Sequence, residues 1–458
     1  MDRGISGRCF SGGFGARGSA VFLGCVGVAL TLGIVAPSAS PGLSFAGPRT
    51  YASGFDPESI ALGDLNRDGK QDLAVANSGS RTVSVLTNSG EGRFRRRDYR
   101  TGKFPASVAI GDVNGDRKPD LAVANVHSNT VSVLENIGGG NFRRRDYGTG
   151  SSPTSVAIGD LNGDGKPDLA VANSVSNSVS VLENTGGGSF AAKINYLAGP
   201  DPESVAIGDL SGDGRADLVL GNFETEHTVS VLINRGDGSF QAAVAYTTGD
   251  DPISVAIGDL NGDRKSDLAV ANDTGDTVSV LTNVGGGRFS AKRDYQTGHI
   301  PLSVAIGDLN GDRKPDLAVA NEDDASVSVL ANRGDGSFRA RHDYETGSGP
   351  DSVAIGDLNG DHKPDLATAN SNVSIGGGRT ASVLVNATGR CGVPDVTRAD
   401  LSYARRALGR ANCRVGTIRR AYSKIAAKGL VISERPRSGT LLRAGSKVDL
   451  VVSRGRKH

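Results

Sequence analysis

Seven short acidic segments hold the side chains of this chain that are best suited to chemistry. The third segment begins at Asp160 and places oxygen-bearing side chains at positions 1, 3, 5 and 9, which are Asp160, Asn162, Asp164 and Asp168. A hard cation such as Ca²⁺ takes about six to eight oxygen ligands at about 2.3–2.6 Å. Alternate residues of a tight loop can supply several of them, together with the backbone carbonyl of Lys166 at position 7. The spacing therefore predicts a calcium loop.

The same positions recur in all seven segments, and successive segments start 48, 48, 49, 50, 49 and 49 residues apart. Ser replaces Asn at position 3 of the fourth segment. We therefore expect up to seven structural calcium ions, with these candidate ligands: Asp64, Asn66, Asp68, Asp72; Asp112, Asn114, Asp116, Asp120; Asp160, Asn162, Asp164, Asp168; Asp209, Ser211, Asp213, Asp217; Asp259, Asn261, Asp263, Asp267; Asp308, Asn310, Asp312, Asp316; Asp357, Asn359, Asp361, Asp365.

A second interpretation of these segments is a turn rich in Asp and Asn, because both residues stabilise turns without any metal. An EF-hand is not expected, since no Glu stands at position 12 and no helical pattern flanks the loop. Position 6 divides the set. Gly suits a positive φ there in segments 1, 3 and 4, whereas segments 2, 5, 6 and 7 carry Arg117, Arg264, Arg313 and His362, for which weaker binding is expected.

The elements that must position these loops are short strands. In the third repeat, four apolar runs of strand length alternate Val, Ile or Leu with Ala, Ser or Gly and are separated by Gly, Asn and Asp: 155–159, 169–173, 178–182 and 190–196. Neither face of such a strand is truly polar, so we expect each small sheet to lie between two neighbours. A period of 48 to 50 residues with four strands per unit predicts a mainly β, seven-bladed propeller.

Repeats of this kind resemble the FG-GAP and VCBS-type repeats of bacterial secreted proteins, which are related to the integrin alpha-subunit propeller. The resemblance covers residues 45–389 and implies that each acidic segment is a calcium loop between the first and second strands of a blade. The run Phe45 to Tyr51 matches the fourth strand of later repeats, and the seventh repeat lacks one. We therefore expect the N-terminal run to complete the last blade.

The first 40 residues have the order of a secretory signal. Arg3, Arg8 and Arg17 precede an apolar stretch, 19–36, which small residues follow. This predicts a secreted protein, with an uncleaved membrane anchor as the alternative. Cys9 and Cys25 fall inside the signal, so Cys391 and Cys413 remain, and in an exported protein such a pair predicts a disulfide.

The last segment, 390–455, has a different pattern and is expected to form a small α+β domain. Leu401, Ala404, Leu408 and Ala411 lie on one helix face, and 429–433 and 447–453 are expected to be strands. The segment resembles a PASTA domain in its Val393-Pro394-Asp395-Val396 start and its Ser438–Thr440 turn. That resemblance implies recognition of peptidoglycan or other cell-wall polymers.

Charge separates the two modules. Residues 391–458 hold 16 Lys and Arg against 4 Asp and Glu, a net charge of +12, which leaves −11 for residues 1–390. A basic domain is drawn to anionic wall polymers, and an acidic ring attracts cations. Nucleic acid is excluded as the expected partner because export argues against it and the tail offers only Tyr403 and Tyr422 for base stacking.

Recognition by the ring is expected where the repeats differ, on the face opposite the acidic loops. The candidate ligand-binding residues there are Glu224, Glu226, His227, Asp276, Glu322, Asp323 and Asp324, with an insertion at 374–378. No nucleophile elbow, P-loop or zinc spacing occurs, so we do not expect an enzyme. The sequence thus predicts a cell-wall-associated binding or adhesion module, with a polysaccharide-acting hydrolase or lyase as the alternative and an unknown protein or glycan as the ring's ligand.

Overall fold

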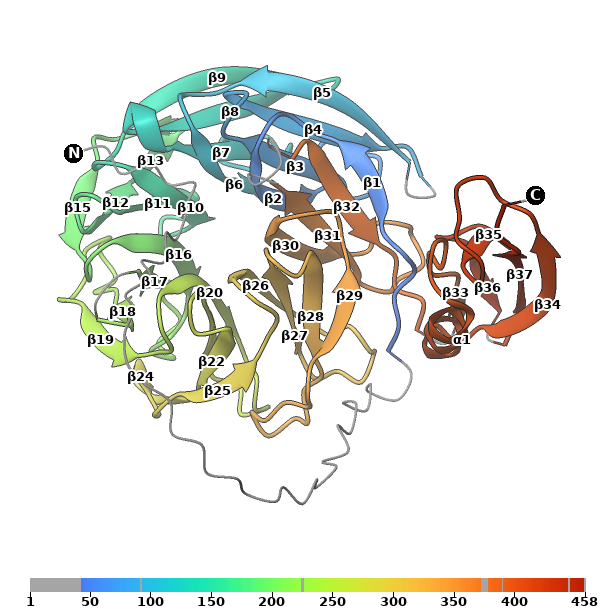
Figure 1. Ribbon diagram of the computed structural model, residues 1–458. Helices are drawn as coiled ribbons and strands as arrows, with labels where there is room; N and C mark the ends of the chain where they lie inside the picture. The colour runs from blue at the N-terminus through green and yellow to red at the C-terminus, as the bar shows by residue number, and fades with distance from the viewer. Residues whose placement is uncertain are drawn as a thin grey trace, which may run out of the picture.

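The computed structural model describes residues 43–90, 93–223, 226–371, 378–388, 390–443 and 445–456. The expected signal, residues 1–40, lies outside them. Within this part of the chain, seven four-stranded antiparallel sheets are arranged around a common axis, and a small second domain lies beside them (Figure 1). The prediction of a mainly β protein built of repeated four-stranded blades is confirmed.

The innermost strands contact one another in succession around the ring, including β2 with β30. They are β2 (Pro57–Gly63), β6 (Pro105–Gly111), β10 (Pro153–Gly159), β16 (Pro202–Gly208), β20 (Pro252–Gly258), β26 (Pro301–Gly307) and β30 (Pro350–Gly356). The second strands are β3 (Asp72–Asn77), β7 (Asp120–Asn125), β11 (Asp168–Asn173), β17 (Asp217–Asn222), β21 (Asp267–Asn272), β27 (Asp316–Asn321) and β31 (Asp365–Asn370).

The third strands are β4 (Thr82–Asn88), β8 (Thr130–Gly138), β12 (Ser178–Leu182), β18 (Thr228–Leu232), β22 (Thr277–Leu281), β28 (Ser326–Leu330) and β32 (Thr380–Leu384). The outer strands are β5 (Phe94–Arg100), β9 (Asn141–Gly148), β15 (Ile194–Leu197), β19 (Val244–Thr247), β25 (Arg293–Gln296), β29 (His342–Glu345) and β1 (Arg49–Ala52). Short hairpins, β13 (Asn184–Gly186) with β14 (Ser189–Phe190) and β23 (Asn283–Gly285) with β24 (Arg288–Phe289), and a 3-10 turn, η1 (Val126–Ser128), complete the ring.

The second strand of each blade is completely buried because blades cover both of its faces. In β3, Leu73 and Val75 pack toward the seventh blade, whereas Ala74 and Ala76 face the second blade and contact the cluster that contains its Leu121. Small side chains on one blade therefore receive large ones from the next. This packing explains the alternation of large and small residues in the sequence.

The N-terminal strand closes the ring by completing the last blade, as predicted from the order of strands in the repeats. β1 pairs antiparallel with β32, from Arg49 opposite Val383 to Ala52 opposite Thr380. The strand is shorter than expected, since Phe45 makes only an isolated bridge with Asn386. An edge-to-face Tyr–Phe pair joins every two neighbouring blades, and the two closing pairs are Phe45 with Tyr344 and Tyr51 with Phe94. The N-terminal segment therefore supplies aromatic contacts to both neighbours of the last blade.

The C-terminal domain contains α1 (Leu401–Arg410), β33 (Arg390–Gly392), β34 (Arg414–Ala421), β35 (Val431–Arg435), β36 (Leu441–Arg443) and β37 (Lys447–Ser453). The sheets have the strand orders β34-β37-β35 and β33-β36. Ala404 and Leu408 on α1 enter the core, as predicted, and Asp400 caps the helix by accepting the Tyr403 N–H. Strands β33, β34 and β36 were not predicted from the sequence. No helix in the described residues is long and apolar enough to cross a membrane.

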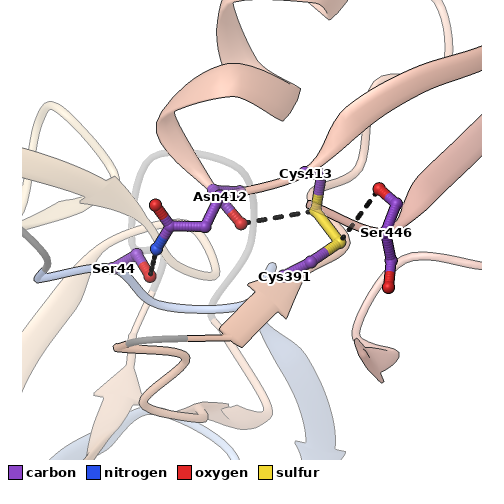
Figure 2. The surroundings of a disulfide bond; sticks show 6 residues. Ser44, Cys391, Asn412, Cys413 and Ser446 are labelled. Carbon is purple, nitrogen blue, oxygen red and sulfur yellow. Dashed lines mark hydrogen bonds between the residues drawn. A yellow bond between two sulfur atoms is a disulfide. The ribbon is translucent and has the colours of Figure 1, made fainter. Parts of the chain in front are cut away.

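A disulfide joins Cys391 to Cys413 with an S–S distance of 2.11 Å (Figure 2). Next to it, the Asn412 amide donates to Ser44 Oγ at 3.4 Å, which links the domain to the N-terminal segment (Figure 2). Arg49 Nη2 of β1 also donates to the Gly439 carbonyl at 2.9 Å. The second domain therefore contacts the ring at the closing blade.

Deletion of residues 1–52 should destabilise the ring because it removes β1 and both closing aromatic pairs and exposes the edge of β32. We expect a lower melting temperature and aggregation, measured by calorimetry and light scattering. Deletion of residues 1–42 is the matched control and should melt like the full chain. Equal melting of the two truncated proteins would contradict this account of closure.

Candidate metal loops

All seven acidic loops connect an innermost strand to the second strand of the same blade, so they lie on one face of the ring. Each loop contains two residues with positive φ, at positions 4 and 6. In the third loop these are Gly163 and Gly165, with φ of 77° and 79°. The loops therefore share one backbone conformation.

The weaker fit expected of the four loops without Gly at position 6 is not visible in their backbone. Arg117, Arg264, Arg313 and His362 adopt φ of 65°, 65°, 66° and 62°. A left-handed non-Gly residue costs roughly 1–2 kcal/mol, and it persists only where the surroundings impose it. The aspartate at position 1 imposes it here, because its carboxylate accepts the N–H of residue 6 in each of these loops, as Asp259 Oδ2 does for Arg264 at 2.8 Å.

The side chains at positions 1, 3 and 5 organise the loop around its own backbone. In the third loop, Asp160 Oδ1 accepts the Gly163 N–H at 2.8 Å and Oδ2 accepts the Gly165 N–H at 2.8 Å. Asn162 Oδ1 accepts the Asp164 N–H at 3.0 Å, and Asp164 Oδ1 accepts the Lys166 N–H at 2.9 Å. The Asn162 and Asp164 contacts are Asx turns, and Asp160 bonds N–H groups three and five residues further on, so the turn interpretation of the sequence accounts for the loop's shape.

In several loops, the lysine at position 7 places its ammonium group beside the aspartate at position 5. Lys166 Nζ lies 2.6 Å from Asp164 Oδ2, and this hydrogen bond holds the pKa of Asp164 below its usual range. Equivalent pairs form in loops 1, 2 and 5. The donor set, made of carboxylate and amide oxygens with one hydroxyl oxygen at Ser211, fits the chemistry of Ca²⁺. Within the described residues, however, no three Asp, Glu, His or Cys side chains converge closely enough to hold a metal ion. Calcium binding stays a prediction.

The aspartate at position 9, predicted as a calcium ligand, is buried and also accepts hydrogen bonds in the core. Asp168 is completely buried: its Oδ2 accepts the Leu161 N–H at 2.9 Å and its Oδ1 accepts the Asn184 N–H at 2.7 Å. Burial raises the pKa of these aspartates, to about 6 for Asp72 and Asp120 and to about 7 for Asp316 and Asp365. The position-9 carboxylate is therefore a structural group whether or not a cation is present.

Sequence reasoning missed the asparagine that partners it. Asn184 Nδ2 donates to the carbonyl of Pro167 at 2.8 Å and to that of Val113, in the loop of the preceding blade, at 2.7 Å. The contact to the preceding loop recurs at all seven junctions, including Asn88 to Leu358 across the closure. An Asn two residues after the Val-Leu of every third strand was the available signal: Asn88, Asn136, Asn184, Asn234, Asn283, Asn332 and Asn386.

The seventh loop departs from the pattern because it meets the segment that leads to the second domain. Lys363 Nζ donates to the Thr388 carbonyl instead of contacting Asp361. The Asp361 carboxylate has Arg390 Nη1 at 3.6 Å, and its side chain is only 13% exposed. A residue of β33 thus takes the place that the loop's own lysine holds in loops 1, 2, 3 and 5.

On the opposite face, the structure brings together some of the predicted ligand-binding residues. Asp276 Oδ2 lies 2.9 Å from His299 Nδ1, and Asp324 Oδ2 accepts the His299 N–H at 3.0 Å. The hydrogen bond to Asp276 raises the pKa of His299, a residue the prediction omitted. His227 lies apart, where its Nδ1 accepts the Asp251 N–H at 3.1 Å.

The other predicted residues do not join this cluster. Glu226 and Asp323 are exposed, and Glu322 is half-buried. Glu224 and most of the 374–378 insertion lie outside the described residues.

Family profiles match both modules. The profile described as FG-GAP-like repeat matches residues 64–123, 112–171, 160–220, 212–270, 259–319 and 308–368. These matches follow one another without a gap across about two thirds of the chain. The chain belongs to the FG-GAP-like repeat family. The profile described as PASTA domain matches residues 392–454, so the FG-GAP ring is joined to a PASTA domain.

The chain is also similar to a probable serine/threonine-protein kinase PknB of Lactococcus lactis subsp. lactis (strain IL1403), with 38% identity over 79 residues in the PASTA region. The match covers 17% of this chain and 13% of the kinase, so most of the kinase has no counterpart here.

Solved structures share the fold of the FG-GAP ring. The BBS1N chain of a complex with ARL6DN has a TM-score of 0.54 and 14% identity over 74% of this chain and 96% of that one. A catalytically inactive virginiamycin B lyase from Staphylococcus aureus, solved with quinupristin, has a TM-score of 0.51 and 12% identity over 75% and 99%. At such identities the likeness shows the propeller fold alone.

Removal of a position-9 carboxylate should destabilise the FG-GAP ring even without metal. Asp168→Ala leaves two buried N–H groups without acceptors, which should cost about 2–5 kcal/mol. Asp164→Ala removes an exposed carboxylate of the same loop and is the matched control; because its hydrogen bonds to Lys166 are exposed to solvent, it should lose far less stability in EGTA than Asp168→Ala. Urea unfolding in EGTA measures both. An Asp168→Ala protein as stable as the control would show that the buried hydrogen bonds do not matter.

Proposed function

We propose that this protein is an exported, calcium-stabilised binding module that its PASTA domain holds at the cell wall. The observation that carries the proposal is the joining of an FG-GAP ring to a PASTA domain within a C-terminal segment, 391–458, that has a net charge of +12. The two modules have opposite charge and different folds. One polypeptide can therefore attach to an anionic polymer and present a second surface elsewhere.

The charge of the PASTA domain faces solvent. Arg405, Arg406 and Arg410 on α1 and Arg419 and Arg420 on β34 are all exposed. Arginines of this kind attract phosphate and carboxylate groups over several ångströms and form bidentate contacts with them. Anionic wall polymers supply both groups, so we propose them as the partner of this domain.

Calcium is proposed as the structural cofactor of the FG-GAP loops. The support is the recurrence, in seven loops of one backbone conformation on one face, of carboxylate oxygens at one spacing, with an amide oxygen at position 3 in six loops and the Ser211 hydroxyl in the fourth. Asp64, Asn66, Asp68 and Asp72, and their equivalents in the other loops, would hold the ion. A bound cation would neutralise the carboxylates of each loop, which otherwise repel one another and are only partly compensated by the lysine at position 7.

Binding is proposed in preference to catalysis. Some of the described residues that differ between blades lie in separate pairs, such as Asp276 with His299 and His227 with Asp251. Neither pair places a Ser or Thr hydroxyl or a Cys thiol against its histidine, the arrangement that activates the nucleophile in acyl transfer. The loops of a rigid ring are instead suited to recognition of a protein or glycan.

Chelation of calcium should lower the melting temperature of the full chain, because each loop loses a ligand that binds only the folded state. Calorimetry with EGTA and with added Ca²⁺ measures the difference, and metal analysis counts the ions. Asp164→Ala should reduce the count by one. Arg264→Ala, which removes no ligand, should leave it unchanged. A metal-free protein that melts like the calcium-treated one would contradict the proposal.

The full chain should sediment with purified cell walls, and the binding should weaken as salt screens it, with a Debye length of about 10 Å at 0.1 M. Charge reversal by Arg419→Glu with Arg420→Glu should reduce the bound fraction severalfold. The same reversal at Arg95 and Arg100 on the outer strand β5 is the control and should have little effect. If only the control variant loses binding, the ring and not the PASTA domain is the anchor.

A further inference from the structure

The seventh acidic loop, 357–365, has an arginine of the second domain beside it. Arg390 is the first residue of β33, and its Nη1 lies 3.6 Å from the Oδ2 of Asp361 at position 5 of the loop. The Asp361 side chain is 13% exposed, whereas its equivalents in loops 1 to 5 are 34–40% exposed. The seventh loop is therefore covered where these other loops are open to solvent.

The repeat does not explain this arginine. In blades 1 to 6, the fourth residue after the asparagine that joins neighbouring blades is a glycine: Gly92, Gly140, Gly188, Gly238, Gly287 and Gly336. The seventh blade has Arg390 at that position. A Cβ added at Gly188 would lie 3.2 Å from the Cβ of Asn114 in the second loop, so the ring itself leaves little room for a side chain there. Arg390 thus belongs to the joint between the two domains and not to the repeated blade.

One oxygen of Asp361 lacks a hydrogen bond. Its Oδ1 accepts the Lys363 N–H at 3.1 Å, whereas its Oδ2 is buried and has no hydrogen-bond partner among the described residues. Lys363 Nζ donates instead to the Thr388 carbonyl. The lysine of the sixth loop also turns to a backbone carbonyl, so this turn alone does not set the seventh loop apart. A buried carboxylate oxygen is stabilised by a nearby positive charge, which here comes either from Arg390 or from a cation taken from solution.

The asparagine at position 3 of the seventh loop is poorly placed to be a metal ligand. The Asn359 amide nitrogen donates to both carboxylate oxygens of Asp365, at 3.3 and 3.2 Å. In loops 1, 2, 3, 5 and 6, the asparagine oxygen accepts the N–H of position 5. Asn310 of the sixth loop makes one contact like that of Asn359, at 3.4 Å, and keeps the usual one as well. In the seventh loop, two of the four candidate ligands are therefore bonded to each other.

We propose that the Arg390 guanidinium occupies the seventh loop in place of a metal ion, so that this loop is the joint between the FG-GAP ring and the PASTA domain. The backbone holds the guanidinium there: the Arg390 N–H donates to the Ala387 carbonyl at 2.6 Å, and the next residue, Cys391, is buried and disulfide-bonded. Its effective concentration at the loop thus exceeds that of a cation in solution. The guanidinium would also repel a divalent ion placed against Asp361.

The joint includes contacts that do not involve the acidic loops. The Tyr403 hydroxyl on α1 donates to Glu345 Oε1 on β29 at 3.2 Å. A Cβ added at Gly392 would lie 3.1 Å from the Cα of Ala46, so the two backbones approach closely beside the disulfide. The PASTA domain should therefore keep its place on the ring when calcium is removed. The proposal rests on calcium binding in the other six loops and removes the seventh from that set.

Metal analysis of the full chain, after dialysis against Ca²⁺, tests the assignment of the loop. Asp361→Ala should leave the number of bound ions unchanged, whereas Asp164→Ala, the same change at position 5 of the third loop, should lower it by one. Arg390→Gln should raise the number by one, because it removes the charge that occupies the loop. A loss of one ion in Asp361→Ala, or no gain in Arg390→Gln, would overturn the proposal. If Asp361→Ala does not fold, Asp361→Asn takes its place.

Trypsin cleavage after Arg390, followed in EGTA by mass spectrometry, tests the joint without calcium. The protease must take the Arg390 side chain away from Asp361, so Asp361→Ala should speed this cut roughly twofold to fivefold, as loss of a partly exposed ion pair predicts. Asp164→Ala should cut at the parent rate. Equal rates in the two variants would show that Asp361 does not hold Arg390. If no loop binds an ion, the calcium proposal fails and the cleavage rates alone decide this one.

Discussion

The ring depends on one buried contact repeated at each junction between blades. A carboxylate at the end of each acidic loop accepts the N–H of an asparagine, and the amide of that asparagine donates to the loop of the preceding blade, as in Asp120, Asn136 and Leu65. Apolar packing alone is non-directional and would tolerate sliding between blades. Because the donors and acceptors are buried, any sliding would leave them unpaired. The contact therefore fixes the rotation of each blade relative to the next.

The same contact ties the acidic loops to the core. The aspartate at position 9 belongs both to the exposed loop and to the buried junction between blades. A cation bound by the loop would therefore be coordinated by a carboxylate that already accepts hydrogen bonds at the junction. Burial, together with the charges of the other loop aspartates, raises the pKa of these groups, and a nearby divalent charge acts in the opposite sense. If the loops bind a cation, occupancy of a loop would be linked to ring stability through the aspartate at position 9, and the two blades that share its junction would respond first.

Much of the fold and the positions of the acidic loops could be predicted from the sequence, because the repeat gives seven copies of each pattern. Period, strand number and the closing role of the N-terminal strand follow from apolar alternation and phase. The role of Asn184 and its equivalents could not be predicted, since a strand-terminal Asn is also an ordinary turn residue. The proximity of Glu58 and Asp351, the second residues of the neighbouring strands β2 and β30, was missed for another reason. The two residues are far apart in the chain and belong to a position that varies between repeats, so only ring closure brings them together.

The disulfide has a mechanical consequence. Suppose a pulling force acts between the ring and the sheet of the second domain. The force reaches the second domain at Cys391 and is transmitted through the S–S bond to Cys413, directly before β34 (Figure 2). The intervening chain, which includes α1, is bypassed by a covalent link and carries no tension. The helix that displays Arg405, Arg406 and Arg410 would therefore keep its shape under this force. The first noncovalent contacts to bear the force are those of Thr388 and Arg390 with the seventh loop.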